Sequence, residues 1–200
     1  MGISAYQVVK LAQKEIDVLS ETDFIKTKRN ISEKITKELN VLAHDISSQI
    51  NWQSHRLFSN CNKSHKVSKG ENLEGLPYFV LDLPNHYKKD DICAFRTVVW
   101  WGKLISFNLH LAGSSLNAIK SFEPLDTHND LKICINPSPW LHHNTADNFV
   151  EANKSNIKER INNAEFLKLT FIHPIEQINE LSKLGFSAFQ YYYKYFSHKE

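Results

Sequence analysis

Two predicted β-strands carry three polar side chains that could form one binding site. The strands cover residues 94–101 and 104–111 and are joined by a short turn. A three-residue turn keeps the apolar side chains of both strands on one face, whereas a two-residue turn would mix the faces, so we expect the first register. Arg96 then lies directly opposite Asn108 on the other face, and His110 is diagonal to Arg96.

The residue types on this face predict recognition of a small anionic ligand. Arg96 offers a planar guanidinium that binds carboxylate or phosphate through two hydrogen bonds, and His110 could act as acid or base near neutral pH. Asn108 would orient the ligand and Trp100 would cover it. Asp82, on the preceding predicted strand, either joins this group or pairs with Arg96. The alternative is a solvated sheet face on which Arg96 lies over Trp100.

Further polar residues lie in two predicted loops. His142 and His143 follow one another in one loop, and Asp126, His128 and Asp130 alternate in the other. Their spacing matches no familiar metal-ligand pattern, and adjacent histidines on an extended chain point apart. We therefore predict solvated loops and no metal site. No cofactor is predicted either, because the glycine-rich nucleotide-binding motifs are missing from the sequence.

The cysteines and the N-terminal residues bear on the compartment. Cys61, Cys93 and Cys134 form no C-x-x-C pair, which fits a reducing environment and three inert thiols. Charged residues such as Lys10 and Lys14 interrupt the start of the chain, which argues against a signal peptide. No apolar run approaches about 18 residues. We expect a cytoplasmic protein with no membrane partner.

The composition is that of a globular protein. Aromatic residues make up 12% of the 200 residues, which excludes global disorder. The formal net charge is only +2, so nucleic acid is an unlikely partner. The segment 53–75 carries four basic side chains before its first acid, Glu71. We interpret it as a basic loop or linker rather than a nucleic-acid contact, since a phosphate-binding track would bring more charge and more aromatic side chains.

The N-terminal quarter of the chain has the apolar period of helices. Residues 3–20 and 31–50 are predicted to be helical and to form an antiparallel hairpin joined near Asp23. Asn30 is the predicted N-cap of the second helix, with Glu33 three residues later. The apolar stripe of this second helix consists of Ile31, Ile35, Leu39, Leu42, Ile46 and Ile50.

From residue 76 onward the apolar period changes to two, which is typical of strands. About five strands are predicted: 76–84, 94–101, 104–111, 131–136 and 166–172. Shorter helices are expected near 115–122 and 154–165, and an aromatic-rich helix at 175–197 follows Pro174. Strands that follow one another closely between flanking helices predict an α+β fold with a mainly antiparallel sheet.

These patterns divide the chain into a helical hairpin (1–52), the basic loop or linker (53–75) and an α+β domain (76–200), which can pack as one unit with the hairpin. We expect a non-catalytic binding or interaction module. Its helices would contact a protein partner or a second copy of the chain. The alternative is a small enzyme or an anionic-ligand-binding protein that uses the sheet face around Arg96 and His110.

Overall fold

The computed structural model describes residues 10–49, 51–59 and 61–197. The helices are α1 (Gln13–Ser20), α2 (Thr22–Gln49), α3 (Ser114–Asn117), α4 (Lys154–Asn163) and α5 (Leu181–Tyr195), with the 3-10 helix η1 (Ile175–Glu180) before α5. The strands are β1 (Lys66–Leu73), β2 (Leu76–Asp82), β3 (Tyr87–Lys88), β4 (Asp91–Trp100), β5 (Leu104–Ala112), β6 (Lys132–Cys134), β7 (Phe149–Glu151) and β8 (Phe166–Pro174).

The predicted α+β class with an antiparallel sheet, an N-terminal helix pair and a C-terminal helix is confirmed. Among the described residues the sheet has eight strands rather than about five, in the order β1-β2-β4-β5-β8-β6-β7, with β3 paired to β4. The additional strands β1, β3 and β7 are short or largely polar. Such segments give no period-two apolar signal, because main-chain pairing rather than side-chain burial holds them.

The hairpin of β4 and β5 has the expected register. Arg96 pairs with Asn108, and Trp100 pairs with Leu104. Gly102 lies in the turn with a φ of +66°, a left-handed conformation that glycine adopts without steric cost. The three-residue turn therefore keeps the apolar alternation of both strands in phase.

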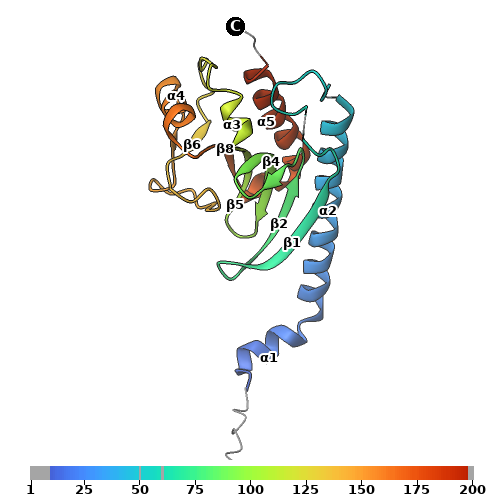
Figure 1. Cartoon of the computed structure of the whole chain (residues 1–200). Helices are drawn as coiled ribbons and strands as arrows, with labels where there is room; N and C mark the ends of the chain where they lie inside the picture. The colour runs from blue at the N-terminus through green and yellow to red at the C-terminus, as the bar shows by residue number, and fades with distance from the viewer. Residues whose placement is uncertain (1–9, 50, 60, 198–200) are drawn as a thin grey trace, which may run out of the picture. The chain divides into compact units, whose positions relative to one another are not determined.

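One face of the sheet forms the main core, and α5 packs against it (Figure 1). The Phe95 ring lies edge-on to the Phe189 ring of α5, with centroids 5.2 Å apart. The buried hydroxyl of Tyr192 donates a hydrogen bond of 3.0 Å to the carbonyl of Phe107. A Cβ atom at Gly185 would lie 2.5 Å from the Leu42 side chain, so the glycine lets α5 and the second half of α2 approach each other closely.

The chain forms two compact units, residues 1–37 and residues 38–200. In the first unit all eight residues of α1 are exposed. Glu21 alone separates α1 from α2, so α2 begins at Thr22 instead of residue 31. The prediction of Asn30 as N-cap is therefore wrong: Asn30 lies inside α2, where Arg29 and Glu33 form an i,i+4 ion pair that supports the helix across this point. Residues 3–9 and Ile50 lie outside the described residues.

The segment 53–75 is less open than a solvated linker. Its second part contains the edge strand β1, which pairs with β2. Its first part buries His55 and Phe58, whose rings stack 4.6 Å apart, and His55 lies 4.3 Å from the Tyr193 ring of α5. In the described part of the chain, none of the helices has the length and apolar character needed to span a bilayer.

Candidate functional site

Arg96 and Asp82 form a two-pronged ion pair between neighbouring strands. Arg96 Nε lies 2.7 Å from Asp82 Oδ1 and Arg96 Nη2 lies 3.0 Å from Oδ2, because β2 and β4 place the two residues directly opposite each other. The Tyr87 hydroxyl donates a further hydrogen bond of 2.9 Å to Asp82 Oδ1. One edge of the Arg96 guanidinium, which the sequence suggested would bind a ligand, is therefore hydrogen-bonded to a carboxylate of the same protein.

The guanidinium also lies against two aromatic rings, which pack against each other. Its central carbon is 5.2 Å from the centre of the Tyr87 ring and 5.5 Å from the centre of the Trp140 ring. This is the cation–π geometry that the sequence suggested, with Trp140 and Tyr87 in place of Trp100. Trp140 comes from residues 137–146, here called the covering loop.

The covering loop is held on the sheet by Lys168 of β8. The Lys168 ammonium donates hydrogen bonds of 2.9 Å to the carbonyl of Pro139 and 2.8 Å to the carbonyl of Leu141, on either side of Trp140. Its side chain is buried, with 2% of the residue exposed. The alternative of a solvated sheet face is therefore wrong in this region, because the covering loop excludes water from the polar residues of β5 and β8.

Three side chains under or within the covering loop have buried polar atoms without a hydrogen-bond partner: Asn108 Oδ1, His110 Nε2 and His142 Nδ1. Asn108 spends its amide hydrogens on the Arg96 carbonyl and the Ser106 hydroxyl, both at 3.0 Å. The His110 ring lies edge-on to Trp140, with centroids 5.4 Å apart. Unpaired buried polar atoms are rare in proteins, so these three mark the region as a candidate binding site.

Burial dominates the electrostatics of these groups. It lowers the pKa of His110 to about 3, with smaller contributions from the positive charges of Lys168 and Arg96. Burial also lowers the pKa of His142, well below its ordinary value, and lowers the pKa of Lys168 to about 8. Both imidazoles are therefore neutral at physiological pH, while Lys168 remains largely protonated.

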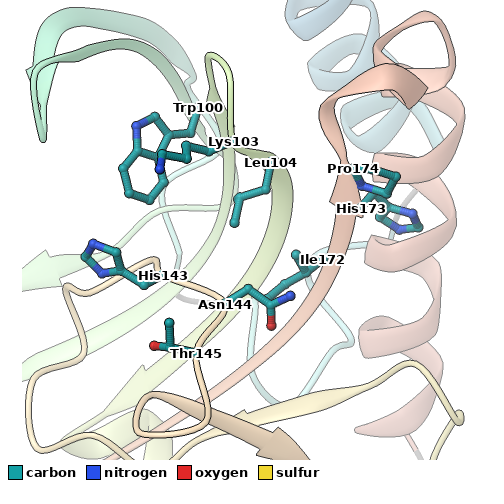
Figure 2. A pocket seen from close by; sticks show the side chains of 9 residues that line it. All are labelled: Trp100, Lys103, Leu104, His143, Asn144, Thr145, Ile172, His173 and Pro174. Atoms are coloured by element: carbon teal, nitrogen blue, oxygen red, sulfur yellow. The ribbon is translucent and has the colours of Figure 1, made fainter.

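Trp100 lies apart from this group and lines a different part of the same face. Its indole nitrogen donates to the Leu73 carbonyl at 3.1 Å. It borders a cavity of about 470 Å³ that also includes Leu104, His143 and Ile172. Figure 2 shows the side chains of the covering loop across this cavity from the β4–β5 turn. Trp100 therefore does not cover Arg96, and its ring instead meets His143 edge-on at 5.2 Å.

The tertiary structure thus brings together Asp82, Arg96, Asn108 and His110 on one sheet face, as their strands predict, and leaves Trp100 at its far end. Sequence reasoning missed Lys168 and Trp140, and its prediction of a solvated loop is wrong for His142, which is buried. Lys168 alternates with the buried Leu167 and Leu169, so the alternation could have placed it on the polar face beside β5. Nothing in the sequence marks residues 137–146 as its cover.

The described residues contain no cluster of three or more histidine, cysteine or acidic side chains that could hold a metal ion. Comparison of the chain with protein-family models, with curated proteins and with solved structures found no match.

Proposed function

We propose that this protein is a non-catalytic binding protein that associates with a second copy of itself through its N-terminal helices. A group of exposed apolar side chains in residues 11–31 carries the proposal. These side chains are 40–63% exposed: Leu11, Ile16, Val18, Leu19, Phe24, Ile25 and Ile31. A concentration of large apolar side chains on one short segment is typical of an association surface.

The chemistry of the sheet face favours binding over catalysis. Proton transfer near neutral pH needs a group whose pKa lies near 7, and burial lowers the pKa of His110 to about 3. Arg96 is held by Asp82 through two hydrogen bonds. His110 therefore lacks a pKa suited to proton transfer near neutral pH, and one edge of the Arg96 guanidinium is already bound to Asp82.

The distribution of charge favours a second copy of the chain as the partner. Residues 13–23 carry four acidic side chains and only one basic residue, Lys14. Residues 24–37 carry five basic side chains and only one acid, Glu33. A two-fold arrangement can set the acidic stretch of each copy against the basic stretch of the other, since a two-fold interface repeats every contact twice.

The energetic scale fits a reversible dimer. Burying the exposed half of a Leu, Ile or Phe side chain contributes about 1 kcal/mol. Seven such side chains per copy give a total of the same order as the cost of losing translational and rotational freedom on association, roughly 4–15 kcal/mol. Because a dimer buries the side chains of both copies, the gain of about 14 kcal/mol can exceed this cost by a few kcal/mol, so we expect a weak dimer whose population depends on protein concentration.

Sedimentation equilibrium of the full chain at several protein concentrations tests this proposal. The double variant Leu19→Ser/Phe24→Ser should raise the dissociation constant of the dimer at least tenfold. Val41→Ser is the matched control, because Val41 is 39% exposed on α2 but belongs to the second unit. A chain that stays monomeric up to about 1 mM, or a control that weakens the dimer equally, contradicts the proposal.

A charge exchange tests the pairing itself. The variant Glu15→Lys/Asp17→Lys should weaken the dimer, and so should Lys26→Glu/Lys34→Glu. An equimolar mixture of the two variants should recover a heterodimer in part, because one acidic and one basic contact region are then complementary. If the mixture associates no better than either variant alone, the proposed arrangement of the two copies is wrong.

A further inference from the structure

Lys168 is a buried cation without a matching negative charge. Its ammonium uses two of its three N–H groups on the carbonyls of Pro139 and Leu141. Among the described residues no salt bridge to an acidic side chain is formed by Lys168, and the Asp82 carboxylate, three strands away in the sheet, pairs with Arg96. Burying a charge without a counter-charge is costly, so this region favours an added negative charge.

The unpaired polar atoms lie next to this cation. His110 of β5 is the direct cross-strand partner of Lys168. Asn108 lies two residues before His110, on the same face of β5. His142 is the residue after Leu141, whose carbonyl Lys168 binds. Asn108, His110 and His142 are each at least nine-tenths buried. The three unpaired atoms therefore lie on the covered face beside Lys168, whose ammonium also lies 5.1 Å from the centre of the Phe149 ring.

The Lys168 ammonium and the three unpaired polar atoms specify which kind of ligand would fit this region. Lys168 can only donate, and a neutral imidazole nitrogen can donate when it carries the proton. Asn108 Oδ1 can only accept a hydrogen bond. A partner that satisfies all of them has negatively charged oxygens for the donors and one hydroxyl hydrogen for Asn108.

We propose that the sheet face under the covering loop binds a small oxyanion that keeps one O–H group, the class to which hydrogencarbonate and hydrogenphosphate belong. Lys168, His110 and His142 hold its oxygens, and Asn108 accepts its hydroxyl hydrogen. The cavity in Figure 2 lies beside this site, because its wall residue His143 is the chain neighbour of His142. This site is independent of the dimer proposed above.

Thermal unfolding of the full chain with added anions tests the site. Sodium phosphate and sodium hydrogencarbonate are compared with acetate, which has no hydroxyl hydrogen at neutral pH, and with chloride at matched ionic strength. A ligand that binds only the folded chain raises Tm with its concentration. We expect a rise with phosphate or hydrogencarbonate, whichever of the two fits, a smaller rise with acetate and none with chloride.

Two variants test whether the anion that raises Tm binds beside Lys168. Lys168→Met should weaken the apparent affinity at least tenfold, whereas Lys103→Met, at an exposed lysine beside the same cavity, should leave it unchanged. If Lys168→Met does not fold, the ¹⁵N resonances of the His110 ring in the unaltered protein decide: they should shift with the anion and stay constant with chloride. Equal responses to all salts, a full response in Lys168→Met, or unmoved His110 resonances overturn the proposal and leave internal water as the occupant.

Discussion

Lowering the pH should destabilise the folded chain through His110, and the size of this effect follows from its burial. His110 is 4% exposed, and burial lowers its pKa from 6.5 to about 3 in the folded protein. The unfolded chain therefore takes up a proton at His110 below pH 6.5, whereas the folded chain does not do so until about pH 3. Its contribution to stability is present above pH 6.5 and is lost as the pH falls toward 3.

Through His110, the free energy of unfolding should fall by about 2 kcal/mol between pH 7 and pH 5. This interval reaches about 1.5 pH units below the ordinary histidine pKa, and each unit corresponds to about 1.4 kcal/mol. Urea unfolding followed by tryptophan fluorescence at both pH values measures it. His110→Gln keeps a polar group near Nε2 but cannot titrate, so its stability should fall about 2 kcal/mol less than that of the unaltered chain over the same pH interval.

The comparison of two pH values cancels any change in packing that the substitution itself introduces. His44→Gln is the matched control, since His44 is exposed on α2, and it should leave the pH dependence of the unaltered chain in place. If His110→Gln loses as much stability as the unaltered chain between pH 7 and pH 5, His110 is not held neutral by burial. His110 would then also be available as an acid or base near neutral pH.

Three further substitutions test the packing around the site and the core. Gly113→Ala should destabilise the chain by about 1–3 kcal/mol in urea unfolding, because φ is +60° and the new Cβ would lie 2.2 Å from the Asp90 carbonyl oxygen. Tyr192→Phe should cost about 1 kcal/mol in the same assay, since it removes the buried hydrogen bond to the Phe107 carbonyl; an unchanged midpoint would mean that this bond is not formed. Burial lowers the Lys168 pKa from 10.5 to about 8, so the folded chain releases this proton first and the unaltered chain should gain up to about 3 kcal/mol of stability between pH 8 and 10.5. Lys168→Met should abolish this gain. A variant whose stability rises with pH as steeply as that of the unaltered chain contradicts this.

The sequence by itself determined the class of the fold and the pairing of its central hairpin. The alternation of apolar residues on both sides of Gly102 allows one register that buries a single face, and this register places Arg96 opposite Asn108. Such information is local, because side chains on a strand alternate with a period of two and a one-residue slip would expose the apolar set. The same reasoning could place Asp82 only as a possible partner of Arg96.

Only the tertiary structure decided what covers that face. The alternation of β8 predicts that Lys168 points away from Leu167 and Leu169, but not whether it meets water. The covering loop, with Trp140 at its centre, returns over the sheet and turns Lys168 and His110 into buried groups. The alternation along one strand specifies the face of the sheet to which a side chain points. Whether that side chain is buried depends on which segment, distant in the sequence, packs on that face, and this is determined by the fold of the whole chain.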